Sequence, residues 1–282
     1  MSTRPRTLIS DLVVGESPRW HADRLWFANW GLAQEIVAAD PDGKTEVVAR
    51  GPKFAGYCLD WLPDGTMLVT GEHDLLRLES DGSYRTHAPL SEVGSGPNDL
   101  VVDGRGNTYV GLIGFAFGEQ QFRPGTIALV TPAGAVRLVA EDIWFPNGMV
   151  VTPDNATLIV AESWANRLTA FDIGPDGELS GRRVWAQLGG DGICLDASGA
   201  IWTSGVSENT PFVQRVREGG EVLDRFEVDG ACFACMLGGA AGTTLFLMVA
   251  DWLGEDRMGE MFTAHTGRVL TTEVDIPHAG RP

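Results

Sequence analysis

Apolar positions along the chain fall in short runs, and turn-forming residues separate one run from the next. In the segment 149–160, two apolar runs flank the tight turn at 153–155. β-Branched residues on both sides of a short polar turn predict a β-hairpin. The same layout recurs at 100–110 and at 193–202. No segment shows the sustained 3.6-residue periodicity of an amphipathic helix. The pattern therefore predicts an all-β protein.

These hairpins belong to a longer repeat. One turn residue marks each copy, and successive copies are 41 to 49 residues apart, at Arg24, Gly65, Gly106, Asn155, Gly199 and Gly242. A second strand–turn–strand half follows in each copy, as at 36–48 and 128–139. Repeats of about 40–50 residues with four strands each are typical of β-propellers. We expect residues 1–282 to form one domain, a six-bladed β-propeller with four-stranded blades around a central channel.

Two segments lie outside the regular repeat. Residues 6–10 precede the first copy, and we expect them to pair with residues 268–274 as the outermost strand of the last blade. Such pairing would close the ring and remove the free sheet edges. The longest insertion, residues 111–124 in the third copy, is expected to form a loop over one mouth of the channel.

The charge and the apolar content of the chain limit the kinds of molecule that it can bind. The chain has 38 acidic and 21 basic residues, a formal charge of -17, which argues against nucleic acid because phosphate contacts need clustered Lys and Arg. The first 11 residues lack the apolar run of a signal peptide, and no run approaches the roughly 18 apolar residues of a membrane span. We expect a cytoplasmic protein with a small-molecule substrate and no membrane partner.

Four cysteines are present, at Cys58, Cys194, Cys232 and Cys235. The spacing of Cys232 and Cys235 occurs in redox and metal motifs. No second pair accompanies it, and the surrounding residues are apolar and glycine-rich. This context favours buried free thiols.

Oxygen-bearing side chains recur at one register of the repeat. The innermost strands of a propeller start near its axis, so equivalent residues of different blades converge there. In successive copies this position holds Glu16, Tyr57, Asn98, Asn147 and Asp191, and in the sixth copy Ala234 or Cys235. One Asn or Asp at a strand end commonly caps backbone groups. Four oxygen donors in one register, two of them carboxylates, instead predict a site for a hard divalent cation.

Several motifs match a known family. Residues 16–20 (Glu-Ser-Pro-Arg-Trp), 97–99 (Pro-Asn-Asp), 145–148 (Phe-Pro-Asn-Gly) and 190–196 (Gly-Asp-Gly-Ile-Cys-Leu-Asp) occur in order, followed by the last-blade motif at 235–239. They resemble the gluconolactonase, senescence-marker-protein and luciferin-regenerating-enzyme family over nearly the whole chain. The resemblance implies a six-bladed propeller that holds one divalent metal ion on Glu16, Asn147 and Asp191. Ca²⁺ is the first choice, with Mg²⁺, Mn²⁺ or Zn²⁺ as alternatives.

The implied reaction is metal-dependent hydrolysis of a lactone or related ester. The metal would polarise the carbonyl group, Asp191 would take a proton from the attacking water, and Asn98 would orient the carbonyl or the developing oxyanion. Glu162 stands at the end of a neighbouring strand as a candidate to support these groups. Two alternatives stay open: phosphotriester or epoxide hydrolysis on the same metal, and a metal- or ligand-binding propeller without catalysis.

Two departures from the family concern the substrate. Members that act on sugar lactones carry an Arg where this chain has Gly96, and a hydroxyl-binding Glu aligns near Gln121. Aromatic residues gather near the expected mouth: Trp30, Tyr57, Phe115, Phe117, Trp144, Phe145 and Trp164. We therefore expect a substrate more apolar than a sugar lactone, with contacts from Asn98, Gln121, Tyr57, Phe115 and Trp144.

Overall fold

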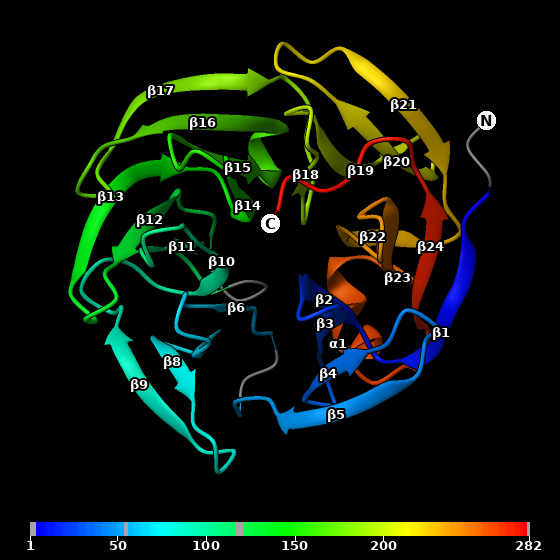
Figure 1. Ribbon diagram of the computed structural model, residues 1–282, viewed down its shortest axis with the longest axis horizontal. Coiled ribbons are helices and arrows are strands. Elements are labelled where there is room, and N and C mark those ends of the chain that lie inside the picture. The colour runs from blue at the N-terminus through cyan, green and yellow to red at the C-terminus, as the bar shows by residue number, and fades with distance from the viewer. Residues whose placement is uncertain (1–3, 54–55, 117–120, 281–282) are drawn as a thin grey trace.

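The computed structural model describes residues 4–53, 56–116 and 121–280. Within these ranges, 24 strands form six sheets of four antiparallel strands each. The sheets are arranged as blades around one axis, and the chain passes from blade to blade around the ring (Figure 1). The predicted six-bladed β-propeller is confirmed.

Each blade is built from four strands that follow one another in space, from the axis to the rim. Blades one to three consist of β2 (Gly15–His21), β3 (Arg24–Asn29), β4 (Glu35–Ala39) and β5 (Thr45–Arg50); β6 (Leu59–Trp61), β7 (Met67–Thr70), β8 (Asp74–Leu78) and β9 (Tyr84–Pro89); and β10 (Pro97–Val102), β11 (Thr108–Leu112), β12 (Gly125–Val130) and β13 (Val136–Ile143). Blades four to six consist of β14 (Pro146–Val151), β15 (Thr157–Glu162), β16 (Arg167–Ile173) and β17 (Leu179–Ala186); β18 (Cys194–Leu195), β19 (Ile201–Ser207), β20 (Thr210–Val216) and β21 (Val222–Glu227); and β22 (Ala231–Gly238), β23 (Thr244–Ala250), β24 (Gly267–Glu273) and β1 (Arg6–Leu12).

The hydrophobic core lies between neighbouring blades. Inner strands such as β7 and β11 are buried along their whole length, whereas the rim strand β5 is largely exposed. A strand buried on both faces has no reason to alternate apolar and polar residues. This explains why the apolar runs in the sequence are continuous rather than alternating.

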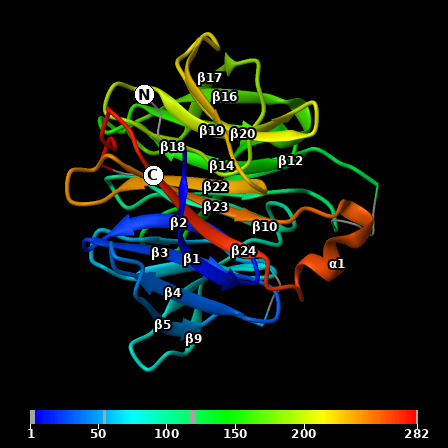
Figure 2. The ribbon, with the colours of Figure 1, turned by 90° about the vertical axis from the view of Figure 1, so that its right-hand side faces the viewer.

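The ring is closed by the first strand of the chain. β1 pairs antiparallel with β24, with Arg6 opposite Thr271 and Leu12 opposite Gly267. In the side view β1 and β24 cross the outer surface together (Figure 2). The predicted pairing is confirmed, and it gives the last blade its fourth strand.

Short helices interrupt the connections, which the sequence did not predict. The described residues contain η1 (Ser163–Ala165), η2 (Glu255–Arg257) and α1 (Met258–Met261). An ion pair between Arg257 and Glu260 supports the last two, but a single turn is too short to produce a readable periodicity. No helix in the described part of the chain is long and apolar enough to span a membrane.

Candidate functional site

The predicted oxygen donors lie at the starts of the inner strands. Glu16, Asn98 and Asn147 are the second residues of β2, β10 and β14. The pairing register of these strands with their neighbours shifts beside each of these residues. Such β-bulges bend a strand and re-aim its side chains, and they are common next to active sites. The bulges therefore occur at the equivalent position of three different blades.

Direct contacts connect these residues. The side-chain amide of Asn98 donates to the carbonyl oxygen of Pro146 at 3.0 Å. The backbone N–H of Gly148 donates to the carbonyl oxygen of Asp191 at 3.2 Å, and the side chain of Asn147 is hydrogen-bonded to the Asp191 carboxyl group. The structure therefore brings Asn98, Asn147 and Asp191 together across blades three, four and five.

A missing side chain at Gly148 makes this approach possible. A Cβ atom there would lie 2.5 Å from the backbone nitrogen of Ile193 and 2.7 Å from the carbonyl oxygen of Asp191. Both atoms belong to the main chain and cannot rotate away. The glycine that follows Asn147 is therefore needed to seat the Asp191 segment against β14.

Buried carboxyl groups at this end of the channel repel one another. Burial, followed by the charge of Asp191, raises the pKa of Glu16 well above its ordinary value. Burial, followed by the charge of Asp99, raises the pKa of Asp191 to about 7, although the hydrogen bond with Asn147 opposes this. Paired carboxylates that are removed from water favour either a proton or a cation between them.

The donor chemistry matches a hard divalent cation. Glu16 and Asp191 supply carboxylate oxygens, and Asn147 supplies an amide group. No group of three or more His, Cys, Asp and Glu side chains is arranged to hold a metal among the residues that the structure describes. The proposed set contains only two such side chains and is completed by an amide, so its members fit oxygen ligation without forming a dense acidic cluster.

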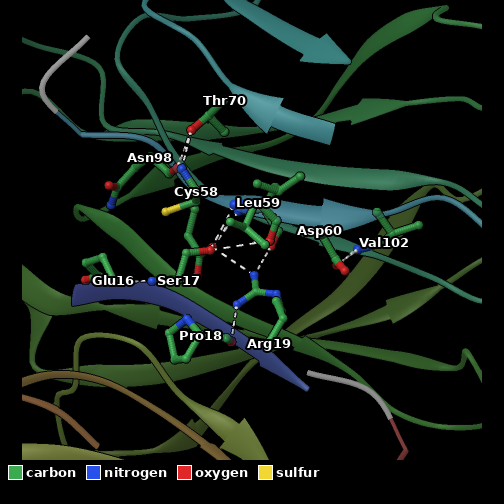
Figure 3. A network of polar contacts seen from close by, with 12 residues as sticks. Glu16, Ser17, Pro18, Arg19, Cys58, Leu59, Asp60, Thr70, Asn98 and Val102 are labelled. Carbon is green, nitrogen blue, oxygen red and sulfur yellow. Dashed lines mark hydrogen bonds and ion pairs between the residues drawn. The ribbon is translucent and has the colours of Figure 1, made fainter. Parts of the chain in front are cut away.

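Residues 16–19 fasten this end of β2 to two other blades (Figure 3). The Ser17 hydroxyl accepts from the Leu59 N–H at 2.9 Å and donates to the Leu59 carbonyl at 3.3 Å. The buried Arg19 guanidinium donates to Asp99 Oδ1 at 3.1 Å and to the Leu100 carbonyl at 2.7 Å. One four-residue segment of blade one thus holds blade two through Ser17 and blade three through Arg19.

Five aromatic side chains form a cluster beside Asn98 and Asn147. Phe145 stacks on Trp164 with 5.3 Å between ring centroids, and Phe122 lies 4.9 Å from Trp144 and 5.0 Å from Trp164. Phe115 packs against Trp164 at 5.3 Å. We call these residues the aromatic wall. Trp144 is 44% exposed, so the wall presents apolar surface to solvent.

The backbone of the aromatic wall at Trp144 and Phe145 has a strained conformation and is held by a hydrogen bond. Phe145 has φ of 60°, which is unusual for a bulky residue and recurs at functional sites. The N–H of Trp144 donates to the fully buried Glu162 carboxylate at 2.8 Å. Burial alone would raise the pKa of Glu162, but hydrogen bonds from Arg167 and Thr169 outweigh it and the pKa is lowered. An ionised Glu162 therefore holds the segment that leads into Asn147.

The other predicted substrate contacts have different outcomes. Phe115 is buried within the aromatic wall, and Gln121 is exposed on the segment that leads into β12. Phe117 lies outside the described residues. Tyr57 does not face the channel: it is fully buried between blades one and two, and its hydroxyl donates to the Glu35 carbonyl at 2.9 Å. The prediction for Tyr57 is therefore wrong, because a carbonyl in the core already satisfies its only polar side-chain atom.

The sixth copy has no oxygen donor at this register. Ala234 and Cys235, the two predicted candidates, are buried in the core. Cys232 instead lines the groove that contains Asp191. All four cysteines are free and buried, as predicted, and burial raises the pKa values of Cys58, Cys194 and Cys232.

The fold and this end of the channel define a class: a six-bladed propeller whose inner strands present carboxylate and amide groups near the axis. The family model described as SMP-30/Gluconolactonase/LRE-like region matches residues 14–251. The chain therefore belongs to this family.

Known proteins resemble it over most of its length. A 6-deoxy-6-sulfogluconolactonase of Pseudomonas putida is 23% identical over 284 residues, covering 96% of this chain and 94% of the relative. A diisopropyl-fluorophosphatase of Loligo vulgaris is 27% identical over 193 residues, covering 58% and 60%. The structure of a calcium-binding protein, regucalcin, from Agrobacterium tumefaciens superposes with a TM-score of 0.77 at 24% identity, covering 98% of this chain and 95% of that one. This last similarity concerns the fold.

Proposed function

We propose that the protein is a divalent-metal-dependent hydrolase of a lactone or related ester, and that its substrate is more apolar than a sugar lactone. The observation that carries the proposal is the convergence of Glu16 and Asp191, two buried carboxyl groups, with the amides of Asn98 and Asn147 beside the aromatic wall. The lactonase name of the Pseudomonas relative supports this reaction class.

Glu16, Asn147 and Asp191 are the residues that would hold the cation. Ca²⁺ is our first choice, supported by the calcium-binding description of the Agrobacterium neighbour, and Mg²⁺, Mn²⁺ and Zn²⁺ are the alternatives. A bound cation would act as a Lewis acid toward the carbonyl oxygen of the substrate.

The remaining steps use side chains of this chain. An ionised Asp191 carboxylate accepts a proton from the attacking water. One N–H of the Asn98 amide is held by the Pro146 carbonyl, which fixes the plane of the amide. The second N–H is left to orient the substrate carbonyl and to stabilise negative charge that develops on its oxygen. The aromatic wall excludes water from the apolar part of the substrate.

Gly96 favours an apolar substrate over a sugar lactone. Its φ is +67°, and a Cβ atom there would lie 2.6 Å from Cγ1 of Ile113. The loop is therefore built for glycine, and an Arg at this position, as in the sugar-lactone members, would need a different loop. Removing a polar group that pairs with sugar hydroxyls weakens discrimination in favour of sugars.

A hydrolysis screen tests the function. We expect metal-free protein to be inactive, and Ca²⁺ to restore turnover of lactones that carry alkyl or aryl substituents, with lower kcat/KM for gluconolactone. A pH indicator reports acid release in each reaction, and heat-treated protein is the blank. If every lactone and ester is stable with each of the four metals, the protein is a binding propeller. Turnover of diisopropyl fluorophosphate alone would favour phosphoester hydrolysis, in line with the Loligo relative.

Stability should depend on pH in a way that calcium reverses. The raised pKa values of Glu16 and Asp191 mean that the metal-free folded state holds these protons more tightly than the unfolded chain does. Their stabilising contribution is therefore complete below the unfolded pKa of about 4. The contribution of Asp191 is lost as the pH rises through about 7, and that of Glu16 is lost as the pH rises through its own raised pKa. We expect the Tm of chelated protein to fall over this interval, and the increase in Tm caused by Ca²⁺ to grow. Differential scanning calorimetry measures both, and a calcium effect that shrinks with rising pH would contradict the ligand assignment.

A further inference from the structure

A groove leads away from Asp191 across blade five. It has a volume of about 640 Å³ and reaches from Asp191 and Cys232 near the axis to Val222 and Arg225 on β21. Val206 and Val222 in its lining are exposed apolar side chains. The groove begins at Ser163, next to Trp164 of the aromatic wall, but none of the five residues of the wall lines it.

The outer part of the groove carries a positive charge. The guanidinium of Arg225 lies over the Phe212 ring, with its central carbon 3.5 Å from the ring centroid. Within the described residues, Arg225 takes part in no ion pair, whereas Arg215 and Arg217 of the same blade pair with Asp196 and Glu221. In a chain with charge -17, an arginine that is stacked on an aromatic ring and left without a carboxylate partner is available to an anionic ligand.

Gln214 extends this polar end of the groove. It stands directly opposite Arg225 in the register of β20 and β21, and both residues line the groove. Gln214 is only 6% exposed as a residue, and the part of it that is accessible lines the groove. Gln214 and Arg225 together offer N–H donors to one acceptor group.

The length of the groove follows from the sheet geometry. Strands in a sheet are about 4.8 Å apart, so Phe212 on β20 lies two spacings, or roughly 10 Å, from the innermost strand of the blade. Because the Arg225 guanidinium folds back over Phe212, it stands at about this distance from the Asp191 end. The groove therefore suits an elongated ligand with its reactive group at Asp191, an apolar middle and an anionic end.

We propose that the groove over blade five is a binding site for a carboxylate carried at the far end of the substrate, held by Arg225 and Gln214. This proposal rests on the proposed function in one respect, which is that the ester or lactone group lies at Asp191, at the inner end of the groove. It defines the substrate class as an amphiphilic ester or lactone with a terminal carboxylate about 10 Å from the scissile carbonyl.

Two probe molecules show how much the terminal carboxylate contributes to binding. Monomethyl suberate has an ester at one end and a carboxylate at the other, and dimethyl suberate is its neutral counterpart. Isothermal titration calorimetry with metal-free protein, which the proposed function leaves inactive, gives the Kd of each probe without hydrolysis. We expect wild-type protein to bind the monoester at least tenfold more tightly than the diester. High salt should reduce this preference, because one end of the groove is open to solvent.

Arg225→Gln is the test variant, and Arg217→Gln is the matched control from the same blade. Arg225→Gln should abolish the preference and leave the Kd of the diester unchanged, whereas Arg217→Gln should retain the preference, since the Arg217 side chain pairs with Glu221 and does not line the groove. Gln214→Leu should weaken binding of the monoester by a smaller factor than Arg225→Gln does. An unchanged preference in Arg225→Gln would overturn the proposal, as would an equal loss in Arg217→Gln.

The outcomes keep the two proposals apart. If neither ester is hydrolysed but the monoester binds in a way that depends on Arg225, the carboxylate site stands and the hydrolase proposal fails. If both esters are hydrolysed with the same KM in wild type and Arg225→Gln, the hydrolase proposal stands and the carboxylate site fails. Melting temperatures of all variants show whether the fold is intact.

Discussion

Asp191→Asn should reduce hydrolysis by about 10³-fold while the ring stays folded. The substitution keeps the shape of the side chain and removes the carboxylate that accepts the proton from water. It also removes one of the two negative charges that would hold the cation. Initial rates on the best lactone from the screen, measured at saturating Ca²⁺, give the size of the loss.

The same variant has a second signature that a general folding defect would not produce. Because Asp191 raises the pKa of Glu16, neutralising it should raise the Tm of the metal-free protein at neutral pH. The stabilisation by Ca²⁺ should become smaller at the same time. Asp154→Asn, in the exposed turn between β14 and β15, is the matched control and should change neither activity nor calcium response. Full activity of Asp191→Asn would refute the mechanism.

Arg19→Met should be the most destabilising single change near the site. Arg19 and Asp99 form an ion pair with side-chain exposures of 6% and 10%, and Arg19 also binds the Leu100 carbonyl. Removing the arginine leaves Asp99 buried and uncompensated, which typically costs about 3–5 kcal/mol. Urea denaturation measures the loss in the free energy of unfolding.

Two further variants show whether the unpaired Asp99 carboxylate causes the loss of stability. The double variant Arg19→Met, Asp99→Asn should recover part of the stability, because no unpaired carboxylate remains. Arg50→Met removes the exposed partner of Glu35 and should cost at most about 1 kcal/mol. If the double variant is as unstable as the single one, the loss comes from the packing of the Arg19 side chain rather than from its charge.

The sequence predicts the architecture well because the repeat is encoded locally. A turn residue such as Gly65 or Gly199 marks each inner hairpin, and the spacing of 41 to 49 residues leaves little freedom in how many blades the ring contains. The partner of residues 6–10 was predictable for the same reason, since the last blade lacked one strand. Local encoding also explains why the short helices were not predicted: η1, η2 and α1 each contain only three or four residues and lie within connections between strands.

The repeat register predicts which backbone positions of the site lie near the axis, but it does not predict the directions of their side chains. Asn98 and Asn147 converge because equivalent strand starts must meet at the axis. The same rule fails for Tyr57, because register places a backbone position and does not decide whether a large side chain turns into the channel or between blades. The ion pair of Arg19 and Asp99 joins blades one and three, and no local pattern records which residues meet across the axis.

The pairing of β1 with β24 has a consequence for how the protein is made. These two strands lie almost the whole chain apart, so a ribosome must finish nearly all six blades before the first strand finds its partner. Until then, the nascent chain exposes an unpaired edge that invites association with other chains. Contacts of such long sequence separation also form slowly. A circular permutant that joins the present ends and opens the chain between β9 and β10 would turn this late, distant pairing into a local hairpin.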